Sequence, residues 1–381
     1  MGSFSIAMHH EAANKINLQL KGALTREASS ALYGVLDRLV KSNQTQMIID
    51  ASNLEHLSGE GLHILTIFFT RAMSKGYHVT LRGLNAVFRQ LFQLTQLTKQ
   101  KQNLAIPGDD IPRNITPVPE QPVDITDHKN GICGQWITSP NIAKFTHAPG
   151  RAVNMNVHGR TLTSPMNSFG RMWLRTYRVG LGKCGLSPEV VMTVWKDRFT
   201  SFWPSGNHLY PSTGAIQPGA VCLINLAMPL GLTLATGAVV IYSNETSFTL
   251  MTVQGHMFSG FITFSTYLEN GNVYAQTQAL IRPNDFIYEA SFWLGFGPKS
   301  EDGFWIRTMR NISTHFVPGN DLRCPLDVQR KVEVTAELID RKINWRHFGN
   351  IWYNAGIRSF IYMLLSPIRK LVSRKQIHKD N

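Results

Sequence analysis

Cysteine is scarce in this chain of 381 residues: there are four copies, and no two form a Cys-x-x-Cys pair. A small domain held by disulfides, or a zinc ribbon, needs closely spaced cysteines, so both classes are excluded. We interpret the four as reduced thiols of a cytosolic protein: Cys133, Cys184, Cys222 and Cys324.

Long apolar runs are also lacking. No stretch of the sequence approaches the roughly 18 apolar residues of a membrane-spanning helix. The first residues, MGSFSIAMHH, lack the basic-then-apolar pattern of a secretory signal. We therefore expect a cytoplasmic protein.

Recognisable catalytic motifs are absent too. The sequence has no His-Glu-x-x-His zinc site, no Gly-x-Ser-x-Gly nucleophile elbow, no Walker loop and no Rossmann glycine pattern. We therefore expect a non-enzymatic protein without a metal or other cofactor, and we assign no catalytic residue. Helix-turn-helix, RNP and zinc-finger patterns are missing as well, so nucleic acid is not expected as a partner.

Positive charge is what the chain has in excess. The formal net charge is +13, and the densest excess lies in residues 326–381, with 11 basic and 5 acidic groups. Anionic lipid or an acidic protein face suits this balance. A chain of this length predicts two domains. Because prolines interrupt its middle, we predict a first domain over 1–100, a Pro-rich linker over 101–149 and a second domain over 150–381.

The first 100 residues show strand-like alternation and helix-like spacing of apolar side chains in turn. After the third strand, which ends at Asp50, we expect a polar turn that contains Asn53. The order β-β-α-β-α-β-α predicts an α/β domain with a mixed four-stranded sheet and helices mainly on one face. Its elements are expected as strands over 3–10 and 15–21, a helix over 28–40, a strand over 46–50, a helix over 60–74, a strand over 78–82 and a helix after Asn85.

Three segments follow one another in this domain: INLQLKGAL, MIIDASNLEHLSGEGLHIL and GYHVTLRGLNAVFRQLFQLTQL. Together they resemble a STAS domain, the fold of anti-sigma-factor antagonists. Some other small α/β domain is the alternative. The resemblance implies a bacterial module that binds a protein partner, such as an anti-sigma factor or a kinase-like protein. Divergent members of the family also serve lipid-transport and signalling assemblies.

The phosphorylation motif of that family is altered in this chain. The family carries Asp-Ser-Ser/Thr-Gly-Leu at the start of the second helix, where a kinase phosphorylates a hydroxyl. Aligning on Gly61 puts Ser58 at the aspartate position, and Gly59 and Glu60 at the two hydroxyl positions. Neither residue accepts a phosphoryl group, and Glu60 brings a fixed negative charge to the helix N-terminus. We predict a docking turn that is not switched by phosphate at the usual site.

Two residues of this region keep alternative interpretations. Ser58 is either a shifted phosphate acceptor or a plain N-cap. Asp50 either matches the strand-terminal aspartate of the family or only stabilises a turn. The candidate docking site consists of Asp50, Asn53, Ser58, Gly59, Glu60 and Gly61.

The second domain is expected to begin with a strand over 153–157, followed by a helix and then further strands. Ser187 and Pro188 are the N-cap and first residue of that helix. The Asn270-Gly271 pair predicts a tight hairpin. Strands are expected over 221–226, 237–242, 247–252, 258–267 and 273–281, and helices over 300–316 and 338–372. An antiparallel sheet with a long last helix across one face is an α+β arrangement called the helix grip.

Residues 237–289 resemble START/polyketide-cyclase-like domains of unknown function. A β-sandwich or barrel with added helices is the alternative. The resemblance implies an apolar cavity for a hydrophobic small molecule between sheet and last helix. His256, in a hairpin turn, is either a ligand contact or a structural residue. The candidate pocket residues are Trp195, Trp203, Phe248, His256, Phe264 and Arg282.

The end of the chain suggests a second kind of contact. Residues 359–365 are apolar, Pro367 interrupts them, and five basic residues follow. This end could touch the inner face of an anionic membrane peripherally. Alternatively, its apolar half is the gripping helix and its basic half a solvated tail.

Two functions fit these observations. In the first, a regulatory adaptor binds a protein partner through its STAS-like domain and senses a hydrophobic ligand with its second domain. In the second, a START-like carrier or enzyme handles a lipid or polyketide-like ligand, and the first domain docks it onto a complex.

Overall fold

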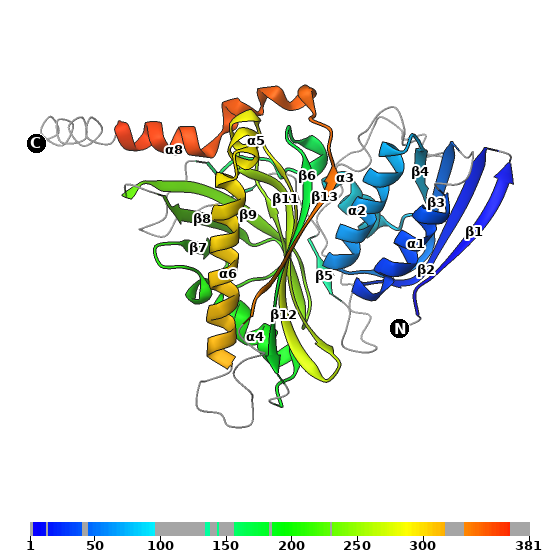
Figure 1. The fold of residues 1–381 in the computed structure, drawn as a ribbon, viewed down its shortest axis with the longest axis horizontal. Helices are drawn as coiled ribbons and strands as arrows, with labels where there is room; N and C mark the ends of the chain where they lie inside the picture. Colours follow the sequence, from blue (N-terminus) through cyan, green and yellow to red (C-terminus); the bar gives the residue numbers. More distant parts are fainter. Residues whose placement is uncertain are drawn as a thin grey trace, which may run out of the picture. The chain divides into compact units, whose positions relative to one another are not determined.

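The computed structural model describes residues 3–12, 14–39, 45–95, 134–137, 143–144, 156–182, 185–228, 231–316 and 331–365. The chain divides into two compact units, residues 1–93 with 97–134 and residues 94–96 with 135–381 (Figure 1). Most of the expected linker, three of the four cysteines and the basic residues after Pro367 lie outside the described residues. The expected domain boundaries therefore stay a prediction.

The first unit contains a mixed sheet in the order β1-β2-β3-β4. Strands β1 and β2 pair antiparallel, whereas β2 with β3 and β3 with β4 pair parallel. The predicted element order and fold class are confirmed. The elements are β1 (Ser5–Ala12), β2 (Lys15–Leu24), 3-10 helix η1 (Arg26–Ala28), α1 (Ser29–Leu39), β3 (Gln46–Leu57), α2 (Gly59–Ser74), β4 (His78–Arg82) and α3 (Ala86–Leu94).

Strand β3 is longer than predicted. The polar stretch after Asp50 is not a turn, because β3 continues to Leu57 and stays paired with β2. Exposed Asn53 and Glu55 alternate there with buried Leu54 and His56. The polar composition suggested a turn, but the period-2 alternation is that of a half-buried strand.

The second unit contains a nine-stranded antiparallel sheet. Its order is β13-β6-β12-β11-β10-β9-β8-β7, and β5 pairs with β9. The predicted meander is confirmed in the five neighbours from β8 to β12. The strands are β5 (Gln135–Trp136), β6 (Met172–Gly182), β7 (His208–Pro211), β8 (Val221–Ala227), β9 (Thr233–Ser243), β10 (Ser247–Thr252), β11 (Phe258–Glu269), β12 (Asn272–Pro283) and β13 (Glu333–Asp340).

The β11–β12 hairpin closes as its sequence predicts. Asn270 and Gly271 both have positive φ, 52° and 75°. A two-residue turn with two positive φ angles matches the twist of the flanking strands, which is why Asn-Gly is favoured there.

Three helices cover one face of this sheet and bury its apolar side chains. Val191 and Trp195 from α4, Phe199 from η3, and Met309 and Ile312 from α6 belong to one buried cluster with that face. The ribbon shows α6 running across the sheet (Figure 1). The helices of this unit are η2 (Pro165–Asn167), α4 (Pro188–Asp197), η3 (Phe199–Phe202), α5 (Phe286–Trp293), α6 (Phe296–Phe316), η5 (Trp345–Tyr353) and α8 (Ala355–Leu364).

The prediction of a helix over 338–372 is wrong. Residues up to Asp340 form β13, which pairs with β6, and the chain then continues through η5 to α8. The fold is still a helix grip, but α6 rather than the last helix lies over the sheet. Residues from Glu333 to Leu338 alternate polar and apolar side chains, which is the pattern of an edge strand.

Candidate functional site

The turn before α2 is built around the Ser58 side chain. Its hydroxyl oxygen accepts a hydrogen bond from the backbone N–H of Gly61 (3.1 Å) and donates one to the Glu60 carboxylate (3.2 Å). Ser58 is therefore the N-cap of α2. Glu60 lies in the first turn, where the helix dipole favours a negative charge. The geometry matches the plain N-cap interpretation of Ser58.

Gly61 is required by a close approach of two backbones. A Cβ atom at this position would lie 2.0 Å from the carbonyl oxygen of Leu24 at the end of β2. The same carbonyl accepts the N–H of Ser58 at 3.1 Å. Packing therefore requires glycine at position 61, the position on which the family motif was aligned. The neighbouring positions 59 and 60 carry no hydroxyl.

Asp50 lies in a local polar network. Its carboxylate accepts the Ser52 hydroxyl (2.6 Å), the Ser52 N–H (3.0 Å) and the Arg82 guanidinium (3.2 Å). Partial burial disfavours the charged form, but these three donors outweigh it and hold the pKa of Asp50 below its usual value. This arrangement matches the stabilising interpretation of Asp50.

The six docking candidates are unequally accessible. Asn53 and Glu55, its neighbour two residues on, are exposed on β3, whereas Ser58 and Glu60 are buried. Asn53 and Glu55 therefore offer the accessible part of this region. The assignment of the set as a docking site stays a prediction.

The six pocket candidates do not gather at one place. Trp195, Trp203, Phe248 and Phe264 belong to the buried cluster on the gripped face of the sheet. There Phe248 stacks on Phe264 (4.6 Å between ring centroids), and Trp195 meets Phe264 edge-on (5.6 Å). His256 and Arg282 lie outside this cluster.

His256 has a structural environment. Its Nδ1 accepts the N–H of Phe258 at 3.0 Å within the β10–β11 turn. Burial lowers the pKa of His256 to about 4, so the ring is neutral near pH 7. A half-buried neutral imidazole held by its own turn suits the structural interpretation.

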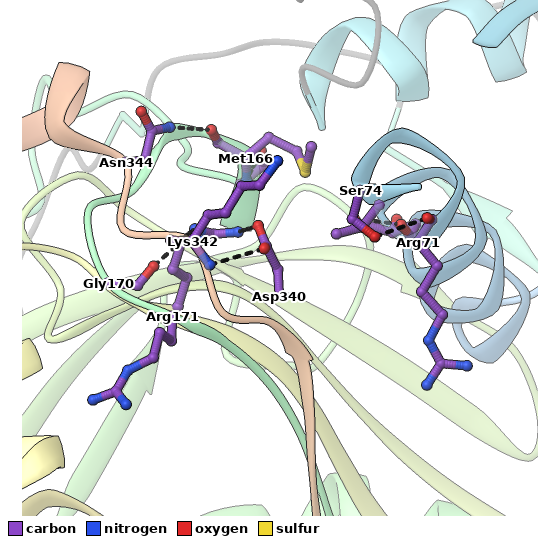
Figure 2. A network of polar contacts seen from close by, with 12 residues as sticks. Arg71, Ser74, Met166, Gly170, Arg171, Asp340, Lys342 and Asn344 are labelled. Atoms are coloured by element: carbon purple, nitrogen blue, oxygen red, sulfur yellow. Dashed lines mark hydrogen bonds and ion pairs between the residues drawn. The ribbon is translucent and has the colours of Figure 1, made fainter. Parts of the chain in front are cut away.

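Arg282 holds the C-terminal segment to the end of β12. Its guanidinium donates to the Asp340 carboxylate (2.6 Å) and to the carbonyls of Gly170 (2.8 Å) and Lys342 (2.9 Å). Asp340 also accepts the N–H of Lys342 (3.0 Å), and Asn344 donates to the Met166 carbonyl (3.4 Å) (Figure 2). The acidic residues that follow Arg282 in the sequence have other partners: Asp285 caps α5 and Glu289 pairs with Arg171.

A polar cluster that the sequence reasoning missed lies between β6 and α6. Arg175 contacts the Tyr177 hydroxyl (3.0 Å), Glu301 (3.4 Å) and Asp302, and the Tyr177 hydroxyl donates to Asp302 (2.9 Å). Arg175, Tyr177 and Val179 occupy every second position of β6. Their side chains therefore point to the same face of the sheet, the one that α6 covers. That period-2 pattern, with an arginine in line with apolar residues, was the available signal.

The charges of this cluster are unusual. Burial of the Glu301 carboxyl, which Arg175 only partly offsets, raises its pKa to about 8. Burial also raises the pKa of Tyr177. For Arg175, burial opposes the charge, but nearby Glu301 and Asp302 outweigh it and raise its pKa. The cluster therefore contains a fixed cation, Arg175, and one carboxyl, that of Glu301, which is largely protonated at pH 7.

Polar atoms without partners adjoin this cluster. Among the described residues, the indole N–H groups of Trp195 and Trp203 and the hydroxyl of Thr277 are buried and have no hydrogen-bond partner. Thr277 stands between Tyr177 on β6 and Phe264 on β11 in the sheet register. Buried polar groups are nearly always paired, so these three groups are exceptions among the described residues.

The described part of the chain gives no sign of a metal site or a membrane span. It brings together no group of three potential metal ligands. None of its helices is both long enough and apolar enough to cross a bilayer.

Fold and site together define a STAS-like α/β unit and a helix-grip α+β unit. Residues 8–106 match the family model described as "Mlab, STAS domain", so the N-terminal part of the chain is similar to STAS domains. No curated protein matches the chain.

Solved structures resemble each unit. The unphosphorylated anti-sigma factor antagonist SpoIIAA is 13% identical over 24% of this chain and 83% of its own, with a TM-score of 0.22. The di-domain ARO/CYC StfQ from the steffimycin biosynthetic pathway is 8% identical over 38% of this chain and 50% of its own (TM-score 0.30). Ginseng major latex-like protein 151 from Panax ginseng is 17% identical over 39% of this chain and 100% of its own, with a TM-score of 0.30.

Proposed function

We propose that this protein is a cytoplasmic bacterial adaptor of the signalling or lipid-transport kind. Its STAS domain binds a protein partner through the region from Asn53 to Gly61, and its second unit binds a hydrophobic small molecule with a polar end. The observation that carries the proposal is the buried Arg175–Tyr177–Asp302–Glu301 cluster beside unpartnered donors on the gripped face. Such a face gives apolar contact and a few placed polar groups, as ligand sites do.

The docking half of the proposal rests on the turn before α2. Ser58 is used as an N-cap, and positions 59 and 60 carry no acceptor hydroxyl, so partner binding is not gated by phosphate there. We expect Glu55→Lys in the full chain to weaken partner capture, because it reverses an exposed charge beside the turn. The matched control is Lys75→Glu at the other end of α2, which reverses an exposed charge away from the turn.

Two results would count against this half. One is equal capture by both variants and the unchanged protein. The other is a phosphopeptide at Ser58 after incubation with ATP and a cognate kinase, since a phosphorylated Ser58 would restore a switch at this turn.

The ligand half is tested with isosteric substitutions. Thr277→Val and Trp203→Phe each remove one unpartnered polar group while keeping most of the side-chain volume. If a ligand uses these groups, native mass spectrometry of the full chain should show about tenfold less bound ligand for each variant. The control is Thr263→Val, because Thr263 bonds Thr249 at 2.8 Å on the other face of the sheet.

A different outcome would defeat the ligand half. If no apolar molecule accompanies the purified protein and Thr277→Val simply raises stability, the hydroxyl has no partner in solution. Replacing an unpaired buried group by a methyl of the same shape is expected to be neutral or stabilising.

The second candidate function, a START-like carrier or enzyme, is favoured by Glu301. A carboxyl whose pKa is raised to about 8 remains a proton donor at pH 7. Recovering the bound molecule chemically altered from the unchanged protein, and unaltered from Glu301→Gln, would favour the enzyme. Equal recovery from both would favour the sensor or carrier.

The proposed cytoplasmic location agrees with the one described cysteine. Cys222 is a buried free thiol, and burial raises its pKa to about 12. A thiol with so high a pKa is unreactive, so nothing in the described part of the chain needs an oxidising compartment.

A further inference from the structure

Helix α8 turns its apolar side away from the protein. Ile357, Phe360, Ile361 and Leu364 are all exposed, and their spacing of three and four residues puts them on one stripe of the helix. The opposite side is small and polar. Ser359 accepts the N–H of Ala235 on β9 at 3.1 Å and the Asn156 side chain at 3.2 Å.

Large exposed aromatic residues also lie on neighbouring elements. Trp352 and Trp345 in η5 are 81% and 68% exposed, and Trp293 and Phe296 at the α5–α6 junction are 71% and 69% exposed. Monomeric proteins rarely leave so many large apolar side chains in water at one end. We call this set, with the α8 stripe, the aromatic surface.

The elements that carry the aromatic surface are joined to one another. Phe286 of α5 stacks on Phe348 of η5 with 5.1 Å between ring centroids, and the Tyr288 hydroxyl accepts the N–H of Gly356 at 3.0 Å. The ribbon shows α5, η5 and α8 at the same end of the second unit (Figure 1). The aromatic surface is therefore carried by one linked end of the unit.

The segment that carries η5 and α8 is basic. Residues 341–365 contain no Asp or Glu, and Arg341, Lys342 and Arg346 are exposed. Arg358 on α8 lies close enough to Arg160 to help lower the pKa of Arg160, after the larger effect of burial. The sequence from 341 to 381 contains nine basic residues and one acidic residue.

We propose that the aromatic surface docks on an anionic lipid bilayer. Helix α8 has ten residues and is about 15 Å long, too short to cross a bilayer, so it would lie in the interface plane. Tryptophan suits the boundary between headgroups and acyl chains, and the cations of the basic segment suit anionic headgroups. This inference concerns a surface that the ligand and partner proposals do not use.

A second copy of the chain fits the same surface less well. A symmetric dimer would pair each patch with itself and bring Arg341, Lys342 and Arg346 of both copies together. Repulsion between these like charges opposes such a dimer, whereas a bilayer with anionic lipid supplies apolar contact and opposite charge at once.

Vesicle flotation of the full chain tests the proposal. We expect the protein to float with phosphatidylcholine vesicles that contain roughly one quarter phosphatidylglycerol, and not with pure phosphatidylcholine. Its tryptophan emission should shift to the blue on binding, and about 0.5 M salt should weaken binding severalfold. Trp352→Ala should weaken binding about tenfold, since a large apolar side chain is withdrawn from the lipid.

Matched variants distinguish lipid contact by this surface from contact by the basic tail or by an exposed apolar side chain elsewhere. The control Leu268→Ala removes a 62% exposed side chain at the far end of β11 and should bind as the unchanged protein does. A chain ending at Leu365 should keep the blue shift and most of its dependence on Trp352. Arg341→Gln with Arg346→Gln should reduce the preference for anionic vesicles.

Three results would overturn the proposal. The first is no flotation with anionic vesicles. The second is full binding by Trp352→Ala, with binding lost on removal of residues 366–381, since lipid contact would then belong to the tail alone. The third is a chain that does not bind vesicles but forms a concentration-dependent dimer by light scattering. If Trp352→Ala abolishes that dimer, the aromatic surface is an interface between two copies.

Discussion

Two helices of the second unit differ in the burial of their apolar residues. Helix α6 turns Met309 and Ile312 to the sheet, and both are fully buried. Helix α8 turns Ser359 to the sheet and leaves Ile361 48% exposed. Both helices are amphipathic in sequence, yet only α6 is held by the burial of its apolar side.

An apolar stripe therefore indicates that a helix needs an apolar neighbour, but not where that neighbour lies. For α6 that neighbour is the sheet of its own unit. For α8, hydrogen bonds from Ala235 and Asn156 fix the polar side, so the apolar side needs a neighbour outside the described chain. The following predictions test this comparison, and tryptophan fluorescence can follow them because all eight tryptophans lie between residues 136 and 352.

Among the substitutions at a fixed pH, Ile312→Ala in α6 is expected to have the largest effect. Removing three buried carbon atoms from a packed site should lower the free energy of unfolding of the second unit by about 2–4 kcal/mol. Denaturant titration followed by tryptophan emission measures this change. A loss below about 1 kcal/mol would show that α6 is not held by its apolar side.

The next effect is a pH dependence that Glu301 on α6 confers. Its pKa rises from 4.5 in the unfolded chain to about 8 in the fold, so the folded state binds the proton more tightly. The contribution of Glu301 to stability is therefore fully present below about pH 4.5 and is lost as pH rises to about 8. The slope is at most about 1.4 kcal/mol per pH unit. Unfolding measured across this range should be steeper for the unchanged protein than for Glu301→Gln.

The control for the pH experiment is Glu189→Gln, which changes an exposed carboxylate in the first turn of α4. It should keep the pH dependence of the unchanged protein. If Glu301→Gln keeps it as well, burial of Glu301 is not its source.

A smaller effect is expected for Ser359→Ala on the polar side of α8. The substitution leaves the buried N–H of Ala235 without its acceptor, which should cost about 1–2 kcal/mol. Hydrogen exchange of the Ala235 amide should become faster, because α8 separates more readily from β9. Ser300→Ala, at an exposed position of α6, is the control and should change neither quantity. Unchanged exchange at Ala235 would mean that the hydroxyl does not fasten α8.

The smallest effect is expected for Ile361→Ala, the counterpart of Ile312→Ala. Because this side chain is half exposed in water, its loss should change the free energy of unfolding by less than about 0.5 kcal/mol. The same denaturant titration measures it. A loss as large as that of Ile312→Ala would mean that the α8 stripe is covered within the chain, and the comparison between the two helices would fail.

The sequence predicts the regular parts of the fold because their patterns are local. The strand over 78–82, the Ser187 cap and the Asn270-Gly271 turn each follow from a few neighbouring residues. Strand β13 could not be found in this way, because it is an exposed edge strand whose partner β6 is over 150 residues earlier in the chain. The identity of the gripping helix was missed for the same reason.

The candidate sites show the same limit. Four pocket candidates lie together because large apolar residues at strand and helix spacing share one core. Arg282 was grouped with them by its place in the sequence, but its partner Asp340 arrives from a distant strand. The Arg175–Glu301 contact likewise joins two elements that no local pattern connects. Which face of α8 meets the sheet depends on Asn156 and Ala235, far away in sequence.

The position of β6 has a consequence for synthesis of the chain. Both sheet neighbours of this strand, β12 and β13, are made later than β6 itself, and β13 ends only at Asp340. While the ribosome translates the intervening residues, β6 is a strand with two open edges, able to pair with another nascent chain. Until Asp340 has been synthesised, this strand therefore keeps at least one open edge.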